Sequence, residues 1–142
     1  MTSGGNAIIR EAVAHVLIID DDPSVILTLS RMLEFEGHQV ATVESAQAAY
    51  VAVDARPPDA ILLDMRMPQI GGLEFLRTLR SQPDRRTIPV GVVTGDYFLT
   101  DAVLQELAAL GATIRYKPLW MEDLQALMRA MLGPASQPAA RS

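Results

Sequence analysis

The stretch VLIIDDDPS, residues 16–24, runs four apolar residues straight into three aspartates and a proline. A short apolar run is typical of a strand buried on both faces, and an acidic residue before a proline is typical of a helix start. The segment therefore predicts a strand followed at once by a helix. Because proline is favoured at the first helical position, Asp22 is expected to cap that helix, which leaves Asp20 and Asp21 at the end of the strand.

The same alternation continues along the chain. Five strands are predicted, separated by segments with helical spacing of apolar residues, at residues 15–20, 38–43, 59–64, 89–94 and 113–116. Such an alternation favours βαβ units and a parallel sheet. The first, third and fourth strands are almost continuously apolar and should be central, whereas the second and fifth are mixed and should be edges. This predicts an α/β, flavodoxin-like (βα)5 doubly wound parallel sheet with strand order 2-1-3-4-5, because the order 3-2-1-4-5 would put the third strand at an edge.

Composition limits the classes of protein. The 142 residues suit one domain, and 49% hydrophobic with 20% charged residues is ordinary globular composition. Twelve basic and 17 acidic residues give a net charge of −5, so a nucleic-acid partner is not expected. The chain has no cysteine, which excludes disulfides and thiolate metal sites. No segment approaches the roughly 18 apolar residues of a membrane span, so we expect no membrane partner and a cytoplasmic protein.

The candidate site lies where the strands end. Ligands of an open parallel sheet bind outside the carboxyl ends of its strands, and five polar residues fall there: Asp20, Asp21, Asp64, Thr94 and Lys117. Three neighbouring carboxylates would raise one another's pKa unless a cation lay between them. Oxygen ligands without cysteine indicate Mg2+ or Ca2+, and a site that keeps waters and adds a phosphate suits Mg2+.

Carboxylates beside Mg2+, with a lysine and a hydroxyl, are equipped for phosphoryl transfer, in which an aspartate can be the nucleophile. The chain has no glycine-rich phosphate loop, so a bound nucleotide is not implied and the donor must come from elsewhere. Taken singly, each residue has a plainer explanation, such as a turn former or a surface charge. The coincidence of the required types at four strand ends favours the site. His15 and His38 each open a strand and are expected to be ordinary strand-end residues.

At these residues the sequence strongly resembles the receiver domain of two-component response regulators, over residues 15–132. LIIDDDPS resembles the acidic pair of that family, LLDMRMPQIGGLEFL its phosphoacceptor segment, VVTG its hydroxyl strand and YKPL its lysine followed by proline. We expect a flexible lead-in at residues 1–13, a receiver domain at 14–132 and a disordered tail at 133–142. So short a tail leaves no room for an effector domain, so a stand-alone receiver is expected.

The resemblance implies a role for each residue. Asp64 would accept a phosphoryl group from a sensor histidine kinase or a histidine phosphotransfer protein, in a self-catalysed reaction of a signalling protein that is not an enzyme. Asp21 would bind Mg2+ directly, Asp20 would assist through water, and the backbone carbonyl of Arg66 would complete the protein ligands together with Asp64. Thr94 and Lys117 would hold the phosphoryl oxygens. Phosphorylation would repack the surface of the fourth helix, fifth strand and fifth helix, where a downstream protein partner would bind.

Two features are particular to this chain. The family usually has an aromatic residue three positions before the lysine, and Ile114 stands there instead, so the aromatic form of the switch is not expected. By strand alternation Ile114 shares a face with Tyr116, which displaces the aromatic along the strand. Arg66 and Asp96 each lie two residues beyond a site residue and carry opposite charges, so two explanations stay open: a pair across the mouth of the pocket, or two unrelated surface charges.

The sequence does not decide which surface binds a downstream partner, and two alternative functions stay open. Four residues lie near the expected output surface and are candidates for docking a partner, although core packing explains them equally well: Phe98, Tyr116, Leu119 and Trp120. A first alternative is an unphosphorylated scaffold that keeps the fold for protein interaction. A second is a small phosphatase of the haloacid dehalogenase type, because DDDPS contains an Asp-x-Asp after the first strand.

Overall fold

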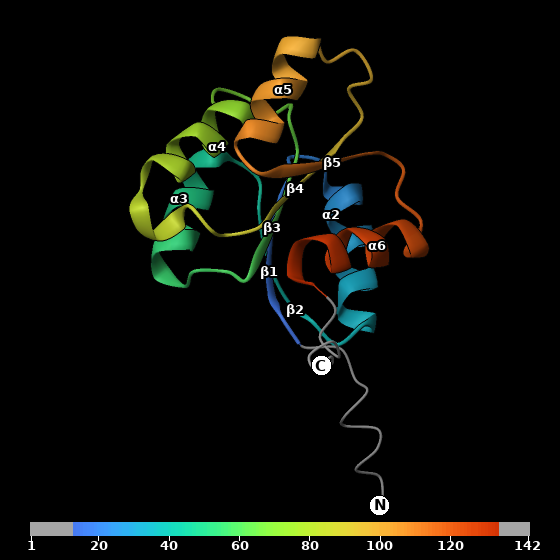
Figure 1. The fold of residues 1–142 in the computed structure, drawn as a ribbon. Helices are drawn as coiled ribbons and strands as arrows, with labels where there is room; N and C mark the ends of the chain where they lie inside the picture. The colour runs from blue at the N-terminus through green and yellow to red at the C-terminus, as the bar shows by residue number, and fades with distance from the viewer. Residues whose placement is uncertain (1–12, 134–142) are drawn as a thin grey trace, which may run out of the picture.

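The computed structural model describes residues 13–133 and consists of a five-stranded parallel sheet between two layers of helices (Figure 1). The strands are β1 (His15–Ile19), β2 (Gln39–Val43), β3 (Ala60–Leu63), β4 (Val90–Thr94) and β5 (Ala112–Tyr116). The helices are α2 (Pro23–Phe35), α3 (Ala46–Ala55), α4 (Gly72–Ser81), α5 (Asp101–Ala109) and α6 (Met121–Leu132), with a short 3-10 helix η1 (Pro83–Arg85).

The sheet has the order β2-β1-β3-β4-β5, as predicted from the hydrophobicity of the strands. Every predicted strand exists, and its ends lie within one residue of the observed ones. The three central strands are buried along their whole length or nearly so, whereas β2 and β5 are only half-buried. The predicted mobile ends, residues 1–13 and 133–142, lie outside the described residues except for their innermost positions.

Each face of the sheet has its own hydrophobic core. Helices α2 and α6 cover one face, and α3, α4 and α5 cover the other (Figure 1). Alternate residues of β1 supply both cores, since Val16 and Ile18 pack toward α2 and α6 while Leu17 and Ile19 pack toward α3 and α4. Burial on both faces is the reason that the central strands need continuous apolar runs.

The register of the strands aligns their carboxyl ends. Ile19 lies beside Leu63, so Asp20 and Asp64, the residues that follow them, leave the sheet side by side. On the other flank, Thr94 of β4 lies beside Tyr116 of β5, and Lys117 follows directly. The alignment of four strands therefore gathers residues from distant parts of the sequence at one edge.

The start of α2 follows the prediction from VLIIDDDPS. Asp22 is the N-cap, with its carboxylate accepting a hydrogen bond of 2.9 Å from the main-chain N–H of Ser24, and Pro23 occupies the first turn. Its carboxylate also accepts from the Ser24 hydroxyl. Asp22 thus stabilises the helix start, where an acidic side chain also suits the helix dipole.

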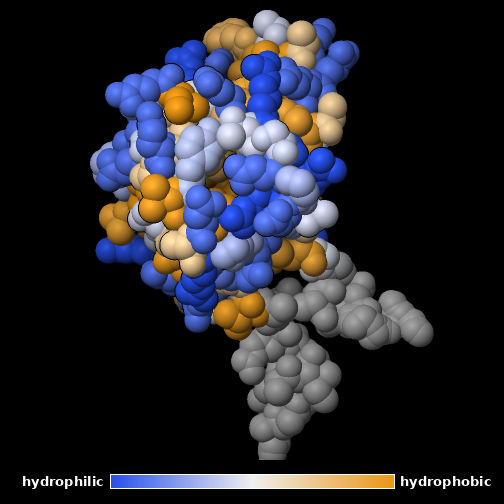
Figure 2. All heavy atoms as spheres, turned by 90° about the vertical axis from the view of Figure 1, so that its left-hand side faces the viewer, coloured by the Kyte–Doolittle hydropathy of each residue, from blue (hydrophilic) through white to orange (hydrophobic). Residues whose placement is uncertain are grey.

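The outer surface is mixed in character. Figure 2 shows the side of the molecule that carries α3 and α4 as mostly hydrophilic, with hydrophobic residues scattered over it. Within residues 13–133, no helix combines the length and the apolar character needed to cross a lipid bilayer.

Candidate functional site

Three carboxylates meet at the carboxyl edge of the sheet. Asp20 and Asp64 are almost fully buried, with 2% and 6% of their surface exposed, whereas Asp21 is exposed. One oxygen of each carboxylate lies within 4.8 Å of the corresponding oxygens of the other two. They are the only residues in the described part of the chain that form such a group. The cluster predicted from the sequence therefore exists.

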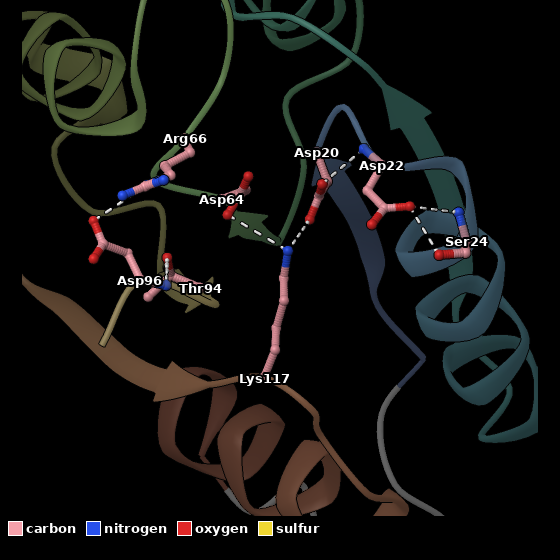
Figure 3. A network of polar contacts seen from close by, with 8 residues as sticks. All are labelled: Asp20, Asp22, Ser24, Asp64, Arg66, Thr94, Asp96 and Lys117. Atoms are coloured by element: carbon pink, nitrogen blue, oxygen red, sulfur yellow. Dashed lines mark hydrogen bonds and ion pairs between the residues drawn. The ribbon is translucent and has the colours of Figure 1, made fainter. Parts of the chain in front are cut away.

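Lys117 supplies the positive charge of the cluster. Its Nζ donates a hydrogen bond of 2.9 Å to Oδ2 of Asp20 and lies 3.5 Å from Oδ1 of Asp64, so it bridges the two buried carboxylates (Figure 3). The main-chain N–H of Lys117 donates a hydrogen bond to the carbonyl of Thr94. The loop after β5 thereby directs the ammonium group into the cluster.

Burial makes Asp64 an unusual carboxyl group. Desolvation, together with the negative charge of Asp20, raises the pKa of Asp64 to about 6, while Lys117 and the main chain of Arg66 oppose this rise. Burial alone would lower the pKa of Lys117, but its hydrogen bond to Asp20 and the charges of both aspartates outweigh that effect and raise the pKa. At neutral pH the lysine is therefore charged, and Asp64 is mostly ionised and held in an electrostatically unfavourable place.

The donor set fits a hard divalent cation. Mg2+ prefers oxygen ligands at about 2.0–2.1 Å, and opposite ligands of an octahedron then lie roughly 4 Å apart. The spacing within 4.8 Å of the three aspartate oxygens is compatible with that geometry. Bringing a second cation among these carboxylates would also relieve the repulsion between Asp20 and Asp64 that raises the pKa of the latter.

A second polar network borders the pocket. Thr94 is fully buried, and its Oγ accepts a hydrogen bond of 3.1 Å from the main-chain N–H of Asp96. The carboxylate of Asp96 pairs with Nε of Arg66 at 3.3 Å (Figure 3), so of the two explanations that the sequence left open, the ion pair is confirmed. The Arg66 side chain is 76% exposed and that of Asp96 is 16% exposed, so the pair lies at the mouth of the pocket.

The start of α4 brings the main chain close to Asp64. A Cβ atom on Gly72 would lie 2.4 Å from the main-chain oxygen of Asp64, so only glycine fits at this position. The main-chain N–H of Gly72 donates to the carbonyl of Met65, which closes the turn between β3 and α4. The glycine is thus a structural requirement of the loop that follows Asp64.

Tyr97 is a pocket residue that the sequence interpretation missed. Its hydroxyl donates to the main-chain carbonyl of Lys117, and its ring stacks on Tyr116 with ring centroids 5.3 Å apart. This contact joins the loop after β4 to the end of β5. A tyrosine three residues beyond Thr94 was the available signal, but a stack between a loop and the end of a distant strand leaves no periodic pattern in a sequence.

Two predictions around β5 are sharpened. Leu119 is only 9% exposed and packs in the core formed by α2 and α6, so it is not a docking residue and its candidacy is wrong. Phe98 and Trp120 are exposed to 90% and 67%.

Ile114 is half-buried and packs against the core on the opposite face of the sheet, while the displaced aromatic, Tyr116, pairs with Tyr97.

The site is an open pocket of about 550 Å³. Its lining combines the acidic cluster, Lys117, Thr94, the Arg66–Asp96 pair and the two aromatic residues of the loop after β4, Tyr97 and Phe98. The volume is many times the roughly 30 Å³ that a water molecule occupies in the liquid. The pocket therefore has room for a cation, a phosphoryl group and part of the molecule that delivers it.

The chain is similar in sequence to known proteins. Residues 16–129 match the family model of the response regulator receiver domain. The response regulator MprA of Mycolicibacterium vanbaalenii is 37% identical over 121 residues, which are 83% of this chain and 50% of that protein. The MprA protein of Mycobacterium avium matches to the same extent. The chain thus spans about half the length of these curated relatives.

Solved structures show the same fold. The chemotaxis protein CheY4 of Vibrio cholerae is 30% identical, with a TM-score of 0.77 over 85% of this chain and 100% of that one. The signal receiver domain of a signal transduction histidine kinase from Syntrophus aciditrophicus is 27% identical, with a TM-score of 0.75 over 92% and 95% of the two chains.

Proposed function

The chain belongs to the response regulator receiver domain family of two-component signalling, and we propose that Asp64 accepts a phosphoryl group from a phosphohistidine donor. The observation that carries the proposal is the bridge of Lys117 Nζ, 2.9 Å from Asp20 and 3.5 Å from Asp64, at the floor of an open pocket. A buried carboxylate that is ionised, poorly solvated and next to a fixed ammonium group is suited to nucleophilic attack on phosphorus.

Each side chain has a distinct task in this proposal. An oxygen of Asp64 attacks phosphorus, and the Lys117 ammonium neutralises the charge of the phosphoryl oxygens. The Thr94 hydroxyl, which accepts from the Asp96 amide in the unphosphorylated protein, turns to donate to a phosphoryl oxygen. Asp21, Asp64 and the main-chain carbonyl of Arg66 would hold Mg2+ directly, and Asp20 would assist through water. When bound, Mg2+ would supply charge neutralisation of the transferring group.

The donor is a sensor histidine kinase or a histidine phosphotransfer protein, and no nucleotide is required at this site. Output passes through the surface of α5, β5 and α6, whose packing shifts between two conformations with the state of Asp64. Stand-alone action through protein contacts stays a prediction, because the curated relatives are about twice as long as the segment that matches.

The phosphatase alternative is disfavoured by Asp22. In that alternative Asp20 and Asp22 would form the reactive pair of an Asp-x-Asp motif. The carboxylate of Asp22 instead accepts two hydrogen bonds from Ser24 and caps α2, while Asp20 is bound by Lys117. The scaffold alternative gains no support from a pocket that retains the complete polar set.

The test is direct chemical detection of the adduct. The protein is incubated with a small phosphodonor and Mg2+, then analysed by intact mass and by peptide mapping. We expect one labile phosphoryl group on Asp64, dependent on Mg2+ and missing in Asp64→Asn. An unmodified wild-type protein, or a phosphoryl group on Asp20 that persists in Asp64→Asn, would exclude the proposal.

A further inference from the structure

We infer that Phe98 is a specificity-determining residue for the phosphodonor: its ring contacts the imidazole ring that leaves when a phosphohistidine donates to Asp64. The inference rests on the proposed function of Asp64 and adds a preference among donors. Phe98 speeds the reaction with donors whose leaving group is an aromatic ring and has no such effect on donors without one.

The position of Phe98 is the first support. Phe98 lines the same pocket as Asp64, yet it is 90% exposed, whereas Asp64 is 6% exposed. Asp64 therefore lies at the floor and Phe98 at the rim. A large aromatic ring left in water at the rim of a polar pocket gains nothing for folding, because it buries almost no apolar surface. The apolar surface of this ring can instead be buried by a bound partner.

The main chain of Phe98 is tied to the polar network of the site. Its N–H donates a hydrogen bond of 3.0 Å to Oδ1 of Asp96, and the other oxygen of that carboxylate pairs with Arg66. The N–H of Asp96 is in turn bound by Thr94. Phe98 is thus held at a defined place relative to the reacting group.

The other aromatic residue of the pocket is already engaged. Tyr97 stacks on Tyr116, and its hydroxyl is bound to the carbonyl of Lys117. Phe98 takes part in neither of the two aromatic pairs found within residues 13–133. Of the two rings in this lining, Phe98 is therefore the more open, with 90% of its surface exposed against 59% for Tyr97.

The chemistry of transfer places the leaving group at the rim. Phosphoryl transfer is roughly in line, so the group that leaves lies opposite the attacking oxygen, away from the pocket floor. The bond between an Asp64 oxygen and phosphorus forms while the phosphorus–nitrogen bond breaks, and the electron pair of that bond stays on the imidazole nitrogen. Because the second ring nitrogen carries a proton, the ring departs as neutral imidazole.

The expected change in rate follows from the energy of a contact between two aromatic rings. Aromatic pairs add enough stabilisation to change a rate constant by about two- to tenfold when the contact exists in the transition state. We therefore expect Phe98→Ala to lower the second-order rate constant for an imidazole donor by roughly this factor. The substitution should leave folding intact, because 90% of the side chain is exposed.

Two small donors with the same reacting bond provide the test. Phosphoimidazole and phosphoramidate both donate across a phosphorus–nitrogen bond, but only the first releases a ring. The rate constant for formation of the Asp64 adduct is measured with each donor, at saturating Mg2+, for the wild type, Phe98→Ala and Phe98→Tyr. Trp120→Ala is the matched control, because Trp120 is 67% exposed and does not line the pocket.

The inference requires that Phe98→Ala slow the reaction with phosphoimidazole alone, that Phe98→Tyr restore it and that Trp120→Ala change neither rate. Equal slowing with both donors would assign Phe98 a role in loop structure only, and unchanged rates would assign it none; either result overturns the inference while Asp64 remains the acceptor. If wild-type protein formed no adduct with either donor, the proposed function itself would fail, and the inference with it.

Discussion

The carboxylate of Asp64 is ionised at neutral pH, although its burial and the nearby Asp20 disfavour that charge. Its pKa is raised to about 6 from the ordinary value of 3.8, chiefly by burial and then by Asp20. A raised pKa in the folded state means that this group contributes most to stability when protonated, below about pH 4. The contribution is lost as the pH rises through 6. Without a cation bound, the ionised carboxylate is thus a cost of the folded protein.

Replacing this carboxylate should therefore stabilise the metal-free protein. Asp64→Asn is expected to raise the free energy of unfolding at pH 7.5 by roughly 1 to 3 kcal/mol, with a gain that shrinks toward zero near pH 4. Denaturant unfolding in chelator at both pH values measures this. The matched control is the exposed Asp21→Asn, for which a smaller gain is expected. A gain for Asp64→Asn that is the same at both pH values would contradict the explanation.

The ion pair at the pocket mouth should set the lifetime of the phosphoryl group. Arg66 and Asp96, 3.3 Å apart, line the same pocket as Asp64 and lie at its mouth. We expect Arg66→Ala and Asp96→Ala to change the rate of dephosphorylation severalfold, because either substitution opens the pair. Loss of the adduct over time, followed by intact mass, gives the rate. Wild-type lifetimes in both variants would show that the pair is only a surface contact of little energetic value.

At the scale of the elements, the turn between β3 and α4 depends on close packing of the main chain. A Cβ atom on Gly72 would clash with the Asp64 carbonyl at 2.4 Å, whereas on Gly71 its nearest contact would be 3.4 Å from the Met65 oxygen. Gly72→Ala should therefore cost roughly 1 to 3 kcal/mol and slow phosphorylation, because Asp64 must shift.

Gly71→Ala is the matched control and should cost less than about 1 kcal/mol with a normal phosphorylation rate. Thermal unfolding and adduct formation measure both effects. The explanation is wrong if the two alanine variants behave alike.

The elements were predictable because their signals are local. The apolar runs of β1, β3 and β4 differ from the mixed β2 and β5, and this contrast decided between the two common doubly wound strand orders. Asp22 before Pro23 gave the start of α2 for the same reason. The engagement of Tyr97 with Tyr116, and the burial of Leu119 against α2 and α6, depend on how a loop packs against distant elements of the fold. No pattern within one segment carries that information.

At the scale of the whole molecule, the site is also a point of linkage between Mg2+ binding and stability. A ligand that binds only the folded state stabilises it, by about 2.7 kcal/mol at 100 times its dissociation constant. Mg2+ should therefore raise the melting temperature of the wild type. Asp21→Ala should weaken this rise, since it removes one of the three carboxylates.

Asp22→Ser provides the matched control, because serine also caps helices and Asp22 serves α2 rather than the metal. Its melting temperature should rise with Mg2+ as much as that of the wild type. If Asp22→Ser lost the response to Mg2+ as fully as Asp21→Ala, the division of labour among the three aspartates would be wrong.

The bridge between Lys117 and Asp20 joins residues that are 97 positions apart in the chain. During synthesis, the carboxylates of β1 and β3 leave the ribosome well before the lysine does. A nascent chain that ends before β5 has aspartates but no ammonium group to pair with them, so it cannot act as a phosphoacceptor of normal efficiency. The proposed acceptor site is therefore complete only after all five strands of the sheet have been made.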